Sequence, residues 1–158
     1  MKQKVFSFRD KFSVKDESGN DRYSVAGRIA PFLIGKKLTV HDSSGNAVAI
    51  VQQKPKGLSM LRFAVMINGH ETCAVVQKFT LFRPKYTIEG FPWLLGGDFI
   101  EHEYELINGD QKVMQLTKKL ISWGDSYELD IADPQHELLC LCIALAVDCS
   151  LAIRDRLR

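Results

Sequence analysis

The feature that most limits how this chain can fold is an apolar segment near its C-terminus. Residues 138–147 (LLCLCIALAV) would be apolar on every face of a helix, and Asp148 interrupts them before residues 151–153 resume the pattern. A helix without a polar face has to be surrounded by protein or by lipid. The rest of the chain must therefore either enclose this helix or leave it to a membrane.

The length of the segment favours enclosure by protein. Asp133 is a suitable N-cap and Pro134 suits the first helical position, so we expect a helix over about residues 134–154. Its apolar part, residues 138–153, is sixteen residues long. A helix of this length is about 24 Å long, whereas a usual membrane span needs about 20 apolar residues, or about 30 Å. We predict a helix buried inside the protein and not a transmembrane anchor.

The residues before the helix alternate between polar and apolar side chains, which is typical of β-strands. Turn formers such as Asn68-Gly69 and Asn108-Gly109 separate the runs, and Asn-Gly is a strong hairpin signal because both residues tolerate positive φ. A large apolar residue followed two positions later by Val, Ile or Leu recurs at Phe12/Val14, Leu38/Val40, Phe63/Val65, Tyr86/Ile88, Tyr104/Leu106 and Tyr127/Leu129. The recurrence fits either an ordinary series of hairpins or an internal duplication. Both interpretations predict about twelve strands over about residues 3–131.

The large number of predicted strands and the apolar helix are consistent with one architecture. A closed barrel of about twelve strands has an interior too wide for strand side chains to fill, and one central helix would fill it. Closure would also remove exposed sheet edges. We therefore predict one mainly β domain over residues 1–158, a closed antiparallel β-barrel of about twelve strands around a central hydrophobic C-terminal α-helix. The side chains expected to pack on the helix are Phe12, Val14, Val40, Phe63, Val65, Tyr86 and Ile88.

Composition limits the classes of function. The chain has 158 residues with 21 Lys and Arg against 19 Asp and Glu, and its net charge of +2 makes nucleic-acid binding unlikely. The N-terminal stretch MKQKVFSFRDKF contains no apolar signal core. We therefore expect a cytoplasmic protein whose cysteines are reduced and buried. These cysteines are Cys73, Cys140, Cys142 and Cys149.

Three stretches of the chain resemble the LURP-one-related (YxjI-like) family. They are KQKVFSFRDKFSVKDESGND, VQKFTLFRPKYTIEG and TKKLISWGDSYELDIAD, the last followed by the apolar helix. The family belongs to the tubby C-terminal-like superfamily, together with the phospholipid scramblases. The resemblance covers essentially the whole chain and implies the same closed barrel around a central hydrophobic helix. Tubby domains bind phosphoinositide head groups through basic surface residues, but their binding positions do not match this sequence residue by residue, so the resemblance implies no site residue.

The chain carries no nucleophile-elbow or phosphate-loop motif, and no second histidine completes a zinc motif at His136. His136 and Cys140 could share a helix face, yet a metal would need two further ligands. Around His102, the acidic Glu101 and Glu103 would share one face of a strand while the histidine points the other way. That arrangement is typical of a solvated strand. We expect no enzyme activity, no cofactor and no metal.

The connections between strands predict two barrel ends of opposite charge. Successive turns of an antiparallel barrel alternate between its ends, which gathers the turns rich in cations and aromatics at one end and the Asp and Asn-Gly turns at the other. The candidate ligand-binding cations are Lys36, Lys37, Lys54, Lys56, Arg62, Arg83, Lys85, Lys118 and Lys119, with Phe32, Leu33, Phe82, Trp93 and Trp123 close by. The acidic residues expected at the opposite end are Asp16, Glu17, Asp21, Asp42, Asp110 and Asp133.

This asymmetry leads to two hypotheses of different classes. In the first, the cationic end binds an anionic membrane surface or a phosphoinositide head group; otherwise the cations only solubilise the loops. In the second, a structural or protein-interaction barrel contacts a protein partner through the apolar loop of residues 91–99 (FPWLLGGDF). Asp148 either pairs with a cation or a backbone N–H inside the barrel, or emerges at its mouth, where it would mark an opening.

Overall fold

A computed structural model of the protein describes residues 1–8, 11–29, 35–54, 60–78, 80, 82–121 and 124–156. The strands are β1 (Lys2–Phe8), β2 (Lys11–Lys15), β3 (Asp21–Ile29), β4 (Lys36–Asp42), β5 (Ala47–Lys54), β6 (Met60–Ile67), β7 (His70–Lys78), β8 (Lys85–Glu89), β9 (Leu94–Asp98), β10 (Glu103–Asn108), β11 (Gln111–Ile121) and β12 (Gly124–Ile131). A 3-10 turn, η1 (Pro134–His136), leads into the helix α1 (Glu137–Arg156). The β region therefore spans residues 2–131, and the helix follows at residues 137–156.

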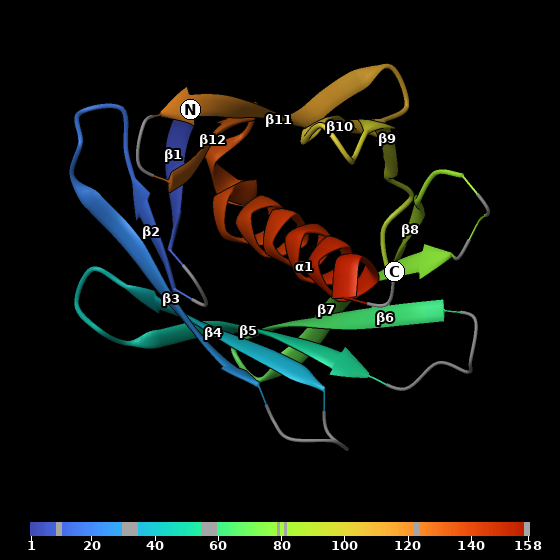
Figure 1. Ribbon diagram of the computed structural model, residues 1–158. Helices are drawn as coiled ribbons and strands as arrows, with labels where there is room; N and C mark the ends of the chain where they lie inside the picture. The colour runs from blue at the N-terminus through green and yellow to red at the C-terminus, as the bar shows by residue number, and fades with distance from the viewer. Residues whose placement is uncertain are drawn as a thin grey trace.

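The twelve strands form one antiparallel sheet that curls around α1 (Figure 1). Strands that follow each other in sequence pair with each other, except β8 with β9, and a ladder between β1 and β12 joins the two ends of the β region. The strand order begins at β8 and finishes at β9. A seam without ladder pairing therefore runs between these two fully described strands. The predicted fold class is confirmed as a nearly closed barrel.

The helix fills the barrel because residues 138–147 are apolar on every face. Leu141, Ile143 and Leu145 are at most 2% exposed. Burying such a side chain contributes about 1.5–3 kcal/mol relative to leaving it in water. Every strand residue that was predicted to pack on the helix lies in the core or packs against it.

Within the described residues, Pro134–Arg154 is the one helical stretch whose length and hydropathy would suffice to cross a membrane. In this fold, 72% of its most apolar window is buried. The barrel thus supplies the apolar surroundings that such a helix requires.

The antiparallel strand order gives the barrel two ends. The turns at residues 16–20, 43–46, 68–69, 90–93 and 109–110 lie at one end together with the start of α1, and we name it the acidic end. All the acidic residues predicted for one end, from Asp16 to Asp133, lie there. The described residues 82–84 and 99–102, which connect β7 to β8 and β9 to β10, lie at the opposite end beside the C-terminal part of α1, and we name it the basic end.

Two predictions about residues 91–99 are wrong. Trp93 lies at the acidic end, because the β8–β9 connection turns there, and its ring packs 5.1 Å from that of His136 between centroids. The segment is also not a loop, since Leu94–Asp98 forms β9 and pairs with β10. The sequence LLGGD does not alternate, and its two glycines weaken a strand, so only the backbone pairing defines β9. Phe32, Leu33 and Trp123, which were predicted beside the cations, lie outside the described residues.

Candidate functional site

The basic end carries exposed cations around its edge. Arg83 is exposed in the β7–β8 connection, and one exposed lysine lies within two residues of the end of each of six strands. We name these residues the rim lysines; they are Lys11, Lys37, Lys54, Lys78, Lys85 and Lys119. Lys37, Lys54, Arg83, Lys85 and Lys119 were predicted as ligand-binding residues, and the structure brings them to one end of the barrel.

Lys36 and Lys118 differ from the rim lysines in direction. Lys118 lies directly opposite Tyr127 in the β11–β12 ladder, and Tyr127 is a core residue. Lys36 precedes the fully buried Leu38 by two positions on β4. Because side chains alternate along a strand, both lysines belong to inward-facing rows, and both residues are half-buried. The prediction grouped them with surface cations, whereas the register turns them toward the barrel mouth.

Arg62 lies in the barrel wall on β6 and not at the surface of the basic end. Its Nη2 lies 2.6 Å from Glu71 Oε1 and its Nε lies 3.2 Å from Glu89 Oε2. Two carboxylates already compensate this charge, so Arg62 is a poor partner for an incoming anion. Lys56 lies outside the described residues.

One sector of the basic end is acidic. Asp98, Glu101 and Glu103 are exposed at the β9–β10 connection. Asp98 Oδ1 accepts a hydrogen bond from the Glu101 N–H at 3.1 Å, and Phe99 O accepts one from the His102 N–H at 3.2 Å. These residues therefore form a turn and not the continuous strand that was predicted around His102.

Beside this turn the seam widens into a groove of about 230 Å³, which is lined by Phe82, Arg83, Pro84, Gly97, Asp98, Phe99, Ile100 and Glu101. Phe82 is 84% exposed, Ile100 is 48% exposed, and Leu94 on β9 is 72% exposed. The only other large apolar residue exposed in the described part of the chain is Met1. Exposed apolar surface is therefore concentrated along the seam.

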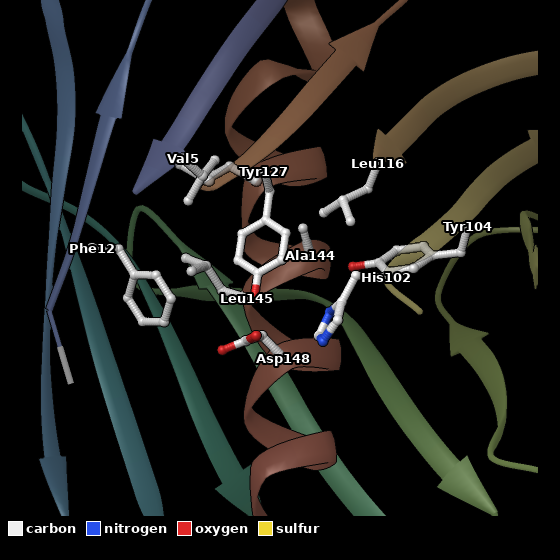
Figure 2. Close-up of a pocket in the computed structure, with 10 residues that line it drawn as sticks. Val5, Phe12, His102, Tyr104, Leu116, Tyr127, Ala144, Leu145 and Asp148 are labelled. Atoms are coloured by element: carbon white, nitrogen blue, oxygen red, sulfur yellow. The ribbon is translucent and has the colours of Figure 1, made fainter. Parts of the chain in front are cut away.

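A second cavity lies inside the barrel, between α1 and strands β1, β2, β10, β11 and β12 (Figure 2). Its enclosed space is only about 20 Å³, which is room for about one water molecule, and we name it the helix chamber. Its lining residues are Val5, Phe12, His102, Tyr104, Leu116, Tyr127, Leu141, Ala144, Leu145 and Asp148. Most of the wall is apolar or aromatic, and Asp148 is the one carboxylate in it.

Asp148 and His102 supply charged or titratable groups to the chamber, from α1 and from the β9–β10 turn (Figure 2). His102 has φ +56°, which non-glycine residues seldom adopt, and its ring lies 5.1 Å from the Tyr127 ring between centroids. Burial, and then the charge of Asp148, raise the pKa of Tyr104 well above its usual value, so this phenol stays protonated. The sequence marked Asp148 as an anomaly and placed His102 on the strand face opposite Glu101 and Glu103, but it did not show that Asp148, His102 and Tyr104 line one cavity.

At the acidic end, Glu137 anchors the start of α1. Its Oε2 accepts a hydrogen bond from Arg22 Nη2 at 2.8 Å, and its Oε1 accepts others from Arg22 Nε at 3.1 Å and from Gln3 Nε2 at 2.5 Å. Glu137 is only 7% exposed. The hydrogen bond to Glu137 holds the pKa of Arg22 above its usual value, so the guanidinium stays charged.

The four cysteines are free and buried, as predicted. Burial raises the pKa of Cys73 and of Cys140 to about 12 and raises that of Cys142 further. Thiols of this kind are unreactive at neutral pH. Over the residues that the structure describes, no group of three or more His, Cys, Asp or Glu side chains is placed to hold a metal ion.

These features define a class of protein, a nearly closed antiparallel β-barrel wrapped around one apolar helix. A family model described as LURP-one-related matches residues 1–148. The chain is 38% identical over 148 residues to the uncharacterized protein YxjI of Bacillus subtilis (strain 168), a match that covers 94% of this chain and 90% of that protein. The chain therefore belongs to the LURP-one-related family, as its sequence predicted.

A solved structure is similar to this fold. The X-ray structure of a protein from Arabidopsis thaliana superposes with a TM-score of 0.61 and covers 93% of this chain and 89% of its own. The two sequences are 14% identical, so the similarity concerns the fold alone.

Proposed function

We propose that this chain is a non-enzymatic binding domain whose basic end binds anionic phospholipid or phosphoinositide head groups. The observation that carries the proposal is the set of six exposed rim lysines around a barrel end from which Phe82 projects, 84% exposed. A Lys near an anionic surface contributes about 1 kcal/mol, and an exposed aromatic side chain can enter the head-group boundary. The resemblance to the tubby C-terminal-like superfamily supports the same class of ligand.

In this proposal the protein is cytoplasmic and contacts the membrane from its surface. The burial of 72% of the most apolar window of α1 supports surface contact, because a helix that left the barrel would expose the core residues that now pack on it. The acidic sector formed by Asp98, Glu101 and Glu103 lies across the groove from Phe82, so this sector would lie at the edge of the contact while Phe82 and the rim lysines face the bilayer.

The test is flotation of the purified protein with liposomes of phosphatidylcholine alone, with added phosphatidylserine, and with added phosphoinositide, at low and at physiological salt. We expect binding only to the anionic liposomes and weaker binding at higher salt. The combined variant Lys37→Ala, Lys54→Ala and Lys85→Ala should lower the affinity by about a hundredfold, because three cationic contacts are lost.

The matched control removes three lysines from the acidic end. The combined variant Lys2→Ala, Lys15→Ala and Lys112→Ala changes the net charge equally and should bind like the parent protein. Equal losses in both variants would show that only net charge matters. Unchanged flotation of the rim variant would reject the proposal.

The seam favours a second candidate, a structural or protein-interaction barrel. The unpaired edges of β8 and β9 could accept an extended strand of a protein partner, and the exposed Leu94 and Ile100 would be covered by it. Such an apolar contact resists salt, unlike the lipid contact. The variant Leu94→Ser with Ile100→Ser should no longer bind a protein partner whose binding resists salt, whereas the rim variant should still bind it. A partner whose binding is lost only in the rim variant would reject this candidate.

A further inference from the structure

One sector of the basic end does not suit contact with anionic lipid alone. Asp98 and Glu101 expose carboxylates at the β9–β10 connection, although the rim lysines favour negative charge. Both carboxylates line the groove at the seam, and Arg83 of the β7–β8 connection lines the same groove. We propose that this groove binds the zwitterionic head group of phosphatidylethanolamine, an inference that rests on the proposed membrane contact.

The groove separates charges of opposite sign. Arg83 lies on the β8 side of the seam, and Asp98 and Glu101 lie on the β9 side. Among the residues that the structure describes, no ion pair joins Arg83 to either carboxylate. A ligand with an anionic group at one end and a cationic group at the other would therefore meet the opposite charge on each wall.

The phosphate and the ammonium of ethanolamine phosphate match these two walls. The guanidinium of Arg83 presents N–H donors in a fixed fork, which fits a phosphate group. The two carboxylates can accept hydrogen bonds from a primary ammonium, whereas the trimethylammonium of choline has no N–H to donate. The groove volume of about 230 Å³ is below the roughly 300–1,000 Å³ of pockets for drug-sized ligands, so it suits a small head group.

Aromatic packing across the seam holds the groove in place. Phe99 is a buried residue of the groove lining, and its ring lies 4.6 Å from that of Tyr86 and 5.2 Å from that of Tyr104 between centroids. The Tyr86 hydroxyl forms a hydrogen bond with Ser150 Oγ of α1 at 2.5 Å. These contacts connect β8, β10 and α1 where ladder pairing is absent, so the groove exists before a ligand binds. A preformed site loses little conformational freedom on binding.

Apolar side chains beside the groove favour a lipid over a free metabolite. Phe82 is 84% exposed and Ile100 is 48% exposed, and both line the groove. Exposed apolar side chains of this kind enter the boundary between head groups and acyl chains. The head group would then lie in the groove while its acyl chains stay in the bilayer beside Phe82 and Ile100. Free ethanolamine phosphate would leave these two side chains in water.

The test uses liposomes of constant negative charge. Each contains the same fraction of phosphatidylglycerol, and the remainder is either phosphatidylcholine or phosphatidylethanolamine, so the rim lysines meet equal charge in both. We expect tighter binding to the phosphatidylethanolamine liposomes in flotation. Glu101→Gln should lower this preference by about two- to fivefold, the usual contribution of an exposed ion pair. The matched control is Glu103→Gln, which removes an exposed carboxylate of the same sector that does not line the groove, and it should leave the preference unchanged.

A second measurement needs no membrane. Soluble dihexanoyl phosphatidylethanolamine, kept below its micelle concentration, should shift the protein-observed NMR resonances of Arg83, Phe99 and Glu101. The phosphatidylcholine analogue should shift them less. Arg83→Gln should weaken the shifts, and thermal unfolding would verify that each variant is folded. If free ethanolamine phosphate bound as tightly as the short-chain lipid, the groove would belong to a metabolite and the assignment to a lipid would be overturned.

Three further results would each overturn the proposal. They are equal binding to the two kinds of liposome, a preference that Glu101→Gln leaves unchanged, and no shift of the groove resonances by the short-chain phosphatidylethanolamine. Failure of flotation on every liposome, with the NMR shifts retained, would reject the membrane contact and support the groove. The two proposals therefore fail separately.

Discussion

The two ends of this barrel are constructed differently although the same strands form both. At the acidic end, the carboxylates of Asp16 and Asp42 accept hydrogen bonds from backbone N–H groups of their own turns, and Arg22 and Gln3 bind the buried Glu137. At the basic end, lysines point into solvent, the seam widens and the helix chamber opens. Stabilising contacts are concentrated at one end, and exposed charge and cavities at the other.

Aromatic residues show the same difference. At the acidic end the rings of Phe91 and Trp93 stack at 4.6 Å between centroids, and Trp93 packs on His136, so together they cover the start of the helix. At the basic end Phe82 is 84% exposed and has no comparable cover. Aromatic side chains therefore cover the core at the acidic end, whereas at the basic end Phe82 is left exposed and could contact a ligand. Binding sites commonly lie on the mobile or open side of a rigid scaffold, which is why we place the proposed ligands at the basic end.

The largest expected effect concerns thiol reactivity, which tests whether the acidic end is closed. Cys73 lies on β7, and Cys140 lies in the first turn of α1. Burial raises the pKa of both thiols from 9.0 to about 12, which lowers the thiolate fraction at pH 8 by about a thousandfold. Ellman's reagent should therefore leave the native cysteines unlabelled and react with all of them after unfolding. A cysteine introduced at the basic end by Ile100→Cys should react at the rate of a free thiol. Rapid labelling of native Cys73 would contradict a closed acidic end.

An intermediate effect is expected from two carboxylates of α1, Glu137 in its first turn and Asp148 in its second half. Glu137→Ala should lower the free energy of unfolding by about 2–3 kcal/mol, because it leaves the buried Gln3 amide and Arg22 without their acceptor. The loss stays below that of a fully buried pair because the Arg22 side chain is 43% exposed. Asp148→Asn should change stability by less than about 1 kcal/mol, since Asp148 lies at the open end. Chemical denaturation of both variants measures the difference, and equal losses would remove the proposed contrast.

The smallest effect is the pH dependence of the turns at the acidic end. Hydrogen bonds led by the Asn20 and Asn46 N–H groups hold the pKa values of Asp16 and Asp42 below their usual range. A carboxyl group whose pKa is lowered in the folded state stabilises the protein at pH values above its unfolded-state pKa of about 4. This contribution is lost as the pH falls through the folded-state pKa. When the pH is lowered from about 5 to about 2, the double variant Asp16→Asn, Asp42→Asn should therefore lose less stability than the parent protein. Thermal melting at several pH values measures the stability of both proteins. The same pH dependence in the variant and the parent would contradict this assignment.

Much of the fold could be predicted because its signals are local. Strict alternation, as in Lys11–Lys15 with the burial pattern of a half-buried strand, and Asn-Gly turns define hairpins within a few residues. The apolar surface of α1 allowed few environments other than a barrel interior. β9 escaped prediction because LLGGD alternates in neither size nor polarity, and its strand conformation comes from backbone bonds to β10.

The candidate site was predicted only in part, and the reason is register. Sequence located the cations near the strand ends, but a shift of one residue turns a side chain to the other face of a sheet. Lys37 and Lys119 therefore point outward while their neighbours Lys36 and Lys118 point inward, a distinction that the composition of the turns does not contain. Arg62 similarly satisfies Glu71 and Glu89 across two further strands.

The sequence by itself determined the hairpin series, the apolar central helix and the segregation of charged turns between the ends, because each depends on residues close together in the chain. Only the tertiary structure decided where the barrel fails to close, which lysines remain in solvent, and that Asp148, His102 and Tyr104 share one cavity. The seam lies between β8 and β9, the lysines lie on strands all around the barrel, and the cavity forms where β1, β10, β12 and α1 meet. Contacts between segments so distant in sequence depend on the register and packing of the whole barrel.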